Sequence, residues 1–160
     1  MNFTHDFIDI PFLFLHKNFM KKSILAKEKF NGLNCSQSVF CVFAPDFGVD
    51  EKTALKIASG FGGGMARGET CGAVTGAYMT IGLKHGHCEN IPEAKANTKA
   101  LIKQFNELFI EKHGSLICKK LIGYDLSIPE ESEKASQEGV FDSICPRLIE
   151  SACDMLEEKF

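Results

Sequence analysis

The residues of this chain best suited to chemistry are its seven cysteines. One of them, Cys71, stands between the glycine-rich stretch 60–68 and a run of small residues at 72–77. At the start of a helix, partial positive charge and free N–H groups stabilise a thiolate or a thiolate-ligated metal centre. The sequence CGAVTG at 71–76 therefore indicates a reactive thiol or a metal ligand.

Three further cysteines stand near predicted helix starts. Cys35 lies at the entrance of a predicted helix, and Cys145 precedes Pro146, a residue favoured in the first helical turn. Cys118 follows soon after Gly114, which ends the preceding helix, so spacing alone is a weaker signal there. Because the same helix-start field acts at each position, these cysteines are candidates for one shared thiolate site with Cys71.

The glycines around Cys71 predict close contacts. Gly72 and Gly76 share a helical face, so another helix or a cluster can approach the backbone there. The 60–68 loop can adopt positive φ angles and direct N–H groups toward sulfur or an anion. It has neither the GK[ST] ending nor the GxGxxG spacing of a nucleotide-binding loop. Arg67 and Glu69 are candidates to cap or neutralise the site.

The other cysteines favour plainer interpretations. Cys41 and Cys153 fall on apolar helical faces, where cysteine commonly behaves as a small buried hydrophobe. His85, His87 and Cys88 crowd a loop just past a helix end, where histidine is also favourable by charge alone. No CxxC pair marks a zinc ribbon or a thioredoxin-like site.

The elements that must position these cysteines are predicted to be helices. No segment alternates apolar and polar residues over the length of a strand, and residues 123–143 are expected to be mostly loop. The chain is therefore predicted to be all-α, a small irregular helical bundle of about five to seven helices. Apolar spacing and caps place these helices at 19–30, 36–43, 51–59, 71–83, 92–113, 115–122 and 146–159.

Composition narrows the classes of function. The net charge of −3 and the lack of a basic run argue against nucleic-acid binding. Residues 1–19 differ in residue composition from 20–160 and are expected to be an N-terminal extension outside the domain. They lack a basic start and a cleavage site, and their apolar run is too short to cross a bilayer. We therefore expect no membrane insertion and a cytoplasmic location, where cysteines remain thiols or bind metals.

The four cysteine contexts together resemble a known family. The stretch from FNGLNCSQSVFC through CGAVTGAYMTIGLKHG, with CKKLIGYDLS and CPRLIESA later, is similar to the redox-active proteins named C_GCAxxG_C_C. The resemblance runs from about Met20 to the C-terminus and implies that Cys35, Cys71, Cys118 and Cys145 are the functional cysteines. In split-Soret cytochromes a related domain accompanies haem and is associated with an iron–sulfur cluster. This chain has no CxxCH motif for covalent haem.

Three hypotheses follow for these four cysteines. The leading one is an iron–sulfur cluster used for electron transfer or sensing with a redox partner protein. The second is a thiol–disulfide oxidoreductase or thiol sensor without a cofactor, in which Cys71 is the nucleophile and another cysteine resolves the mixed disulfide. The third is an interaction module stabilised by zinc bound to the four cysteines. The sequence leaves open whether the protein is an oxidoreductase enzyme and whether it forms a homo-oligomer.

Overall fold

The structure, a computed structural model, describes residues 20–160. The expected N-terminal extension, residues 1–19, lies outside the described residues. The all-α class is confirmed for residues 20–160, whose only β pairing is an isolated antiparallel bridge between Thr70 and Ile117. In chain order the elements are α2 (Lys22–Phe30), α3 (Cys35–Phe43), η1 (Ala44–Phe47), α4 (Glu51–Ala58), η2 (Ser59–Gly64), α5 (Gly72–His85), α6 (Pro92–His113), α7 (Cys118–Ile122), α8 (Pro129–Gln137), α9 (Val140–Ser143) and α10 (Cys145–Lys159).

The region 123–143 corrects one expectation. It was predicted to be mostly loop, but it contains α8 and α9, so the described part of the chain has more helices than the predicted five to seven. Pro129 opens α8, with Glu130 and Glu131 in its first turn, where acidic side chains stabilise a helix start. Gly139 adopts φ +68° between the two helices. These local signals outweigh the polar composition that suggested a loop.

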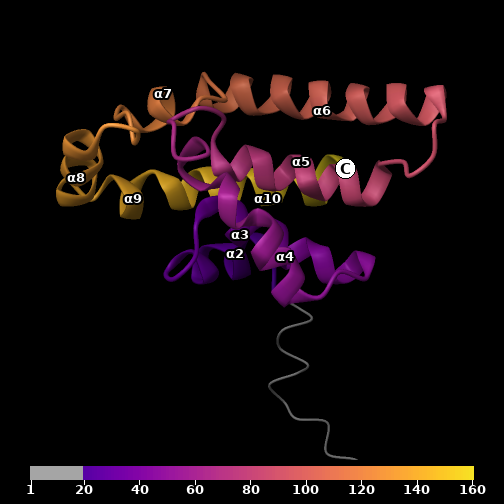
Figure 1. The fold of residues 1–160 in the computed structure, drawn as a ribbon, viewed down its shortest axis with the longest axis horizontal. Helices are drawn as coiled ribbons and strands as arrows, with labels where there is room; N and C mark the ends of the chain where they lie inside the picture. The colour runs from indigo at the N-terminus through magenta and orange to yellow at the C-terminus, as the bar shows by residue number, and fades with distance from the viewer. Residues whose placement is uncertain (1–19) are drawn as a thin grey trace, which may run out of the picture.

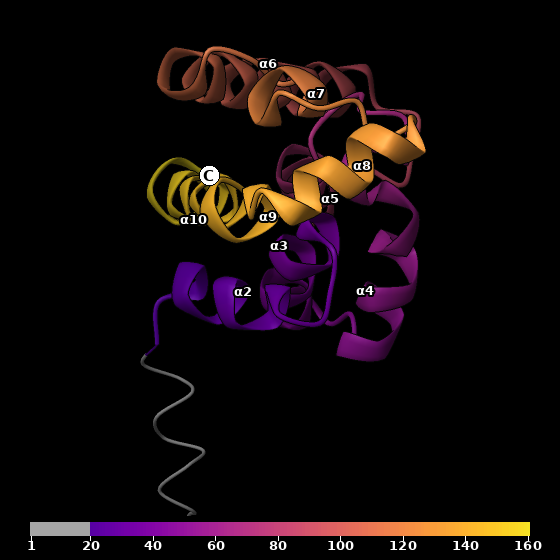
Figure 2. The ribbon, with the colours of Figure 1, turned by 90° about the vertical axis from the view of Figure 1, so that its left-hand side faces the viewer.

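The helices stack in layers, with α6 on one side, α5 and α10 in the middle, and α2, α3 and α4 on the other side (Figures 1 and 2). Phe105 and Phe109 of α6 are fully buried, and their rings stack at 5.8 Å. Tyr78 of α5 meets the Phe105 ring edge-on at 6.1 Å. This aromatic contact fixes α6 against α5, as the apolar spacing in 92–113 predicted.

Helix α3 is buried on nearly every side, because α2, α4, α5 and α10 all pack against it. Eight of its nine residues are buried, Gln37 being the exception. Its neighbour α5 approaches closely at Gly76, where a Cβ would lie 2.8 Å from the Val39 Cβ and 2.9 Å from the Ser36 carbonyl oxygen. The predicted role of Gly76, to admit another helix, is confirmed, and the contact sets α3 beside the start of α5.

The start of α3 is held by a capping box. The Asn34 side chain accepts a hydrogen bond from the Gln37 N–H at 3.0 Å, and the Gln37 side chain accepts one from the Asn34 N–H at 3.1 Å. Asn34 also donates to the Ser59 carbonyl oxygen at 2.9 Å, which ties this cap to the end of α4. The capping box and the bond to Ser59 thereby fix the backbone at Asn34, and with it the position of the next residue, Cys35.

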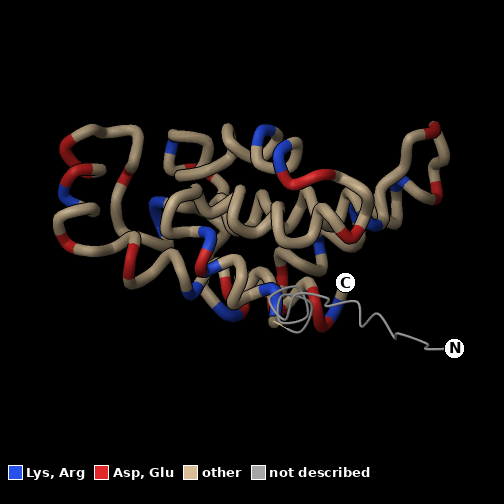
Figure 3. Tube along the Cα trace, turned by 90° about the horizontal axis from the view of Figure 1, so that it is seen from below, with Lys and Arg blue, Asp and Glu red and all other residues tan. Residues whose placement is uncertain are grey.

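The charged side chains of the described residues are of mixed sign. Lys and Arg residues alternate with Asp and Glu residues along the face seen in Figure 3. Ion pairs such as Lys27–Glu150, at 2.8 Å, join separate helices. Among residues 20–160, no helix has the length and apolar character needed to span a membrane.

Candidate functional site

Four cysteines from four separate segments line one cavity of about 170 Å³. Cys35, Cys118 and Cys145 are the first residues of α3, α7 and α10. Cys71 immediately precedes α5. The structure therefore brings all four candidate residues together, each at a helix start, including Cys118, for which spacing alone was the weakest signal.

Two of these positions differ by one residue from the expectation. Cys71 was predicted to be the first helical residue, but it is the N-cap, with φ −55° and ψ 139°. The bridge between Thr70 and Ile117 keeps the backbone extended up to Cys71, so α5 begins at Gly72. Cys145 was expected at the N-cap and is instead the first residue of α10, because Ile144 already has helical angles.

A short antiparallel ladder joins the segments of Cys71 and Cys118. The Cys71 N–H donates to the Leu116 carbonyl oxygen at 2.8 Å, and the Cys118 N–H donates to the Glu69 carbonyl oxygen at 2.6 Å. The two cysteines are therefore diagonal neighbours across the ladder, a relation that places Cα atoms about 7–8 Å apart. This pairing positions two thiols on the same side of the ladder, facing the cavity.

The position of Cys35 depends on the absence of a side chain at Gly72. A Cβ on Gly72 would lie 2.2 Å from the Cys35 Sγ and 3.0 Å from the Ser36 nitrogen. Real Cβ atoms do not make such contacts, so only glycine lets the sulfur lie against the start of α5. The second residue of the CGAVTG sequence thus makes room for a cysteine that is remote along the chain.

The glycine-rich loop supplies part of the surroundings of Cys35. Gly63 and Gly64 have φ of +59° and +62°, and the left-handed turn continues through Met65 and Ala66 at +57° and +56°. A Cβ on Gly64 would lie 2.4 Å from the Glu69 nitrogen, so this turn is tightly folded. The Gly63 N–H donates a hydrogen bond to the Cys35 sulfur. The expectation that this loop turns N–H groups toward sulfur therefore holds at Gly63.

A thiolate is favoured within the pair Cys35 and Cys71. A hydrogen bond from the Cys71 thiol, opposed by burial and assisted by the Gly63 N–H, lowers the pKa of Cys35 to about 6. Donating that hydrogen bond, together with burial, holds the pKa of Cys71 well above its usual value. The two thiols therefore share one favoured deprotonation, and the expectation that Cys71 is the nucleophile stays a prediction.

The two remaining thiols are protonated near neutral pH. Burial, and next the charge at Cys35, raise the pKa of Cys118 and of Cys145 to about 12 each. Loss of all four protons therefore requires a cation among the sulfurs, as thiolate ligation of a metal provides.

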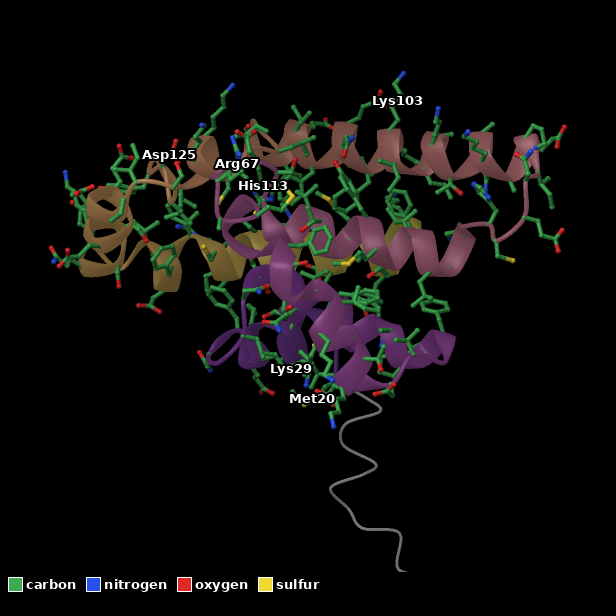
Figure 4. The ribbon with its side chains drawn as sticks, in the orientation of Figure 1. Met20, Lys29, Arg67, Lys103, His113 and Asp125 are labelled. Atoms are coloured by element: carbon green, nitrogen blue, oxygen red, sulfur yellow. The ribbon has the colours of Figure 1, made fainter. Side chains whose placement is uncertain are left out.

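One carboxylate lies at the edge of the site. Asp125 is beside the glycine-rich loop (Figure 4), with its Oδ1 3.1 Å from where a Cβ on Gly68 would be. Hydrogen bonds from Ser127, and then from Lys119, lower the pKa of Asp125 to about 2. Its charge adds to the elevation of the Cys118 pKa. The Asp125 charge thus disfavours a Cys118 thiolate unless a cation is present.

Arg67 and Glu69 were expected to cap or neutralise the site, but their side chains do not contact the sulfurs. Both side chains are exposed. The Glu69 carboxylate lies 4.0 Å from the Lys119 ammonium group, and it is the Glu69 backbone oxygen that contacts the site by accepting the Cys118 N–H. Neutralising charge at the sulfurs therefore comes from backbone N–H groups rather than from these two side chains.

The cysteines and histidines outside the cavity match their plainer interpretations. Cys41 and Cys153 are buried in the core, and Cys88 is exposed. The His85 Nε2 lies 2.9 Å from the Phe160 carbonyl oxygen, and the His87 Nδ1 lies 2.9 Å from the Glu89 carbonyl oxygen.

Among residues 20–160, the four cavity cysteines included, no three His, Cys, Asp or Glu side chains are grouped around a point where a single metal ion would sit.

The rest of the cavity wall could not be recognised from the sequence. It consists mainly of apolar side chains from α2, α7, the segment before α8, and α9, namely Phe30, Ile122, Leu126 and Phe141. Leu126 and Phe141 belong to the region expected to be a loop. Isolated apolar residues in that polar region were the only available signal.

The cavity fits a thiolate-ligated group of several atoms. Its donor set is four thiols, and its volume is close to that of an engineered cavity of about 150 Å³ that holds benzene. A single zinc ion draws four sulfurs to about 2.3 Å and leaves no space of this size between them. The residues present supply the four-thiol donor set of an iron–sulfur cluster and space for a group of several atoms.

The structure is an all-α domain that gathers four cysteines at helix starts around one cavity, an arrangement suited to redox chemistry at sulfur. Comparison with family models supports this class. A family described as "Putative redox-active protein (C_GCAxxG_C_C)" matches residues 33–159. The chain belongs to this C_GCAxxG_C_C family. Comparisons with curated proteins and with solved structures found no match.

Proposed function

We propose that the protein binds an iron–sulfur cluster through Cys35, Cys71, Cys118 and Cys145 and uses it in electron transfer or redox sensing. The observation that carries this proposal is that four thiols, remote along the chain, line one cavity. Iron–sulfur clusters are held by four cysteine thiolates. When bound, the cluster would supply one-electron redox chemistry.

The chain's own residues would hold the cluster and set its surroundings. The four sulfurs provide the ligands, and the N–H groups at the starts of α3, α5 and α10 stabilise their negative charge. The Gly63 N–H adds a hydrogen bond to one of the ligand sulfurs. Hydrogen bonds to sulfur and exclusion of water are the main means by which a protein sets a cluster's potential. The apolar walls from Phe30 and Phe141 serve the second of these.

We also propose that the protein works in the cytoplasm, where the reducing environment keeps cysteines available as thiols or metal ligands. Its electron donor or acceptor would be another redox protein.

Anaerobic purification followed by iron, acid-labile sulfide and zinc analysis tests the proposal. We expect brown protein containing iron and sulfide in similar amounts, with visible absorption that Cys71→Ala strongly reduces. The matched control is Cys153→Ala, because Cys153 is buried in the core away from the cavity and should leave the iron content unchanged. Colourless protein without iron would overturn the proposal, and stoichiometric zinc in its place would select the zinc-stabilised interaction module.

A further inference from the structure

Cys35 and Cys71 form a close pair within the site. Both cysteines line the same cavity. The Cys35 sulfur lies against the residue that follows Cys71, 2.2 Å from the position that a Cβ on Gly72 would occupy. The fold therefore places the Cys35 sulfur beside the backbone that carries Cys71, although the two residues stand at the starts of different helices.

Cys71 and Cys118 have a different relation. They are diagonal neighbours across the ladder, at about 7–8 Å between Cα atoms, whereas Cα atoms in a disulfide are usually about 4.4–6.8 Å apart. A disulfide between them would require the backbone to move, and the hydrogen bond from the Cys118 N–H to Glu69, at 2.6 Å, opposes such movement. Of these two pairs, only Cys35 and Cys71 are prepared to form a disulfide directly.

We propose that a hydroperoxide oxidises Cys35 and Cys71 to a disulfide, and that this disulfide and the bound cluster exclude each other. The second half rests on the proposed function, because a disulfide removes two of the four thiolates that would hold the cluster. The pair would then convert oxidation into loss of the metal centre. This identifies hydroperoxides as the chemical signal to which the same site responds.

The oxidation balances with hydrogen peroxide as the only oxidant. The Cys35 thiolate attacks one peroxide oxygen, the O–O bond breaks, and a sulfenic acid forms at Cys35 while hydroxide leaves and takes a proton to become water. The Cys71 thiol then attacks the Cys35 sulfur, so that the S–S bond forms and the S–O bond breaks. The hydroxyl leaves with the Cys71 proton as a second water. The two thiols lose two electrons in total, and these reduce the peroxide.

The cavity suits this oxidant by size. Cys35 and Cys71 are both buried, which hinders attack on a large disulfide such as oxidised glutathione. A cavity of about 170 Å³ next to both sulfurs has ample space for a molecule as small as hydrogen peroxide.

Peptide mapping of the metal-free, reduced protein tests the disulfide without any cluster. One equivalent of hydrogen peroxide is added anaerobically, remaining thiols are alkylated after denaturation, and cross-linked peptides are identified by mass spectrometry. We expect two of the seven thiols to be lost and Cys35 to be linked to Cys71. A different first pair, or a sulfinic acid at Cys35 without a disulfide, would overturn the proposal.

Two alanine variants of α5 form a matched test of the geometry. Gly72→Ala should slow disulfide formation by about tenfold, because the added Cβ displaces the Cys35 sulfur from its contact. Gly82→Ala in the same helix should leave the rate unchanged, since nothing lies within 4 Å of its Cβ position. Equal rates in the two variants would show that the place of the Cys35 sulfur beside Gly72 does not matter for disulfide formation. If Gly72→Ala fails to fold, Cys71→Ser replaces it and should abolish the disulfide; loss of two thiols in that variant as in the wild type would refute the pairing.

Peroxide treatment of the cluster-loaded protein tests mutual exclusion. Released iron and the disulfide between Cys35 and Cys71 should increase in equal proportion. Iron loss without this disulfide, or the disulfide with iron retained, would refute the exclusion. Because the metal-free mapping requires no cluster, a protein that never binds iron would refute the proposed function alone.

Discussion

Replacing Gly76 by alanine should destabilise the protein, because α3 and α5 touch at this residue. The added Cβ would lie 2.8 Å from the Val39 Cβ and 2.9 Å from the Ser36 carbonyl oxygen. Overpacking of this kind costs about 1–3 kcal/mol, against a gain of about 1 kcal/mol from replacing glycine inside a helix. We expect the free energy of unfolding to fall by about 1 kcal/mol in total.

The same substitution at Gly82 should have the opposite sign. Nothing lies within 4 Å of the Cβ position of Gly82, so alanine there adds helix propensity without a clash. We expect Gly82→Ala to raise the free energy of unfolding by about 0.5–1 kcal/mol. The two variants differ from each other only in where one methyl group is placed on α5.

Urea unfolding of the reduced, metal-free protein, followed by circular dichroism, measures both variants. The midpoints should move in opposite directions with unchanged slopes, because the surface exposed on unfolding is the same. If Gly76→Ala is as stable as Gly82→Ala, the close approach of α3 to α5 is wrong. The position of Cys35 beside Cys71 would then lose its structural basis.

Three further predictions concern the surroundings of the cysteines. Thiolate ultraviolet absorption of the metal-free protein should show a step near pH 6 that Cys35→Ser abolishes. Folding lowers the pKa of Cys35 from an unfolded value near 9. Cys35 therefore stabilises the folded state fully above pH 9, and this stabilisation is lost as the pH falls through 6. No step below pH 8 would contradict this assignment. Asn34→Ala should cost about 1–2 kcal/mol of unfolding free energy by thermal or urea denaturation, and Asn34→Asp should recover most of the cap; equal losses would argue against capping. Phe141→Ala opens the cavity wall and should shorten the lifetime of the cluster's visible absorption in air, whereas an unchanged lifetime would show that Phe141 does not shield it.

Much of the helical framework could be predicted because its signals are local. The helix predicted at 92–113 has those bounds in the structure, since Pro92 starts it and Gly114, with φ +81°, ends it. Residues 123–143 were wrongly expected to be mostly loop because α8 is polar and short. Only its packing, through Ala135 and Val140, shows that it belongs to the domain.

The candidate site was predictable in its residue types but not in its contacts. A cysteine beside a helix start is visible in the sequence at Cys71 and Cys145, and the family resemblance added Cys118. The contact between Gly72 and Cys35 joins two segments that are remote along the chain, so local spacing cannot reveal it. The mutual effect of the Cys35 and Cys71 thiols on their pKa values likewise joins remote segments and is invisible in local spacing.

The central claim, that four cysteines hold one cluster, is tested most directly by X-ray diffraction from anaerobically grown crystals at the iron absorption edge. We predict a strong anomalous signal inside the cavity, bonded to the sulfurs of Cys35, Cys71, Cys118 and Cys145. An empty cavity in crystals grown from iron-loaded protein, or iron bound at other residues such as His87 and Cys88, would contradict the account.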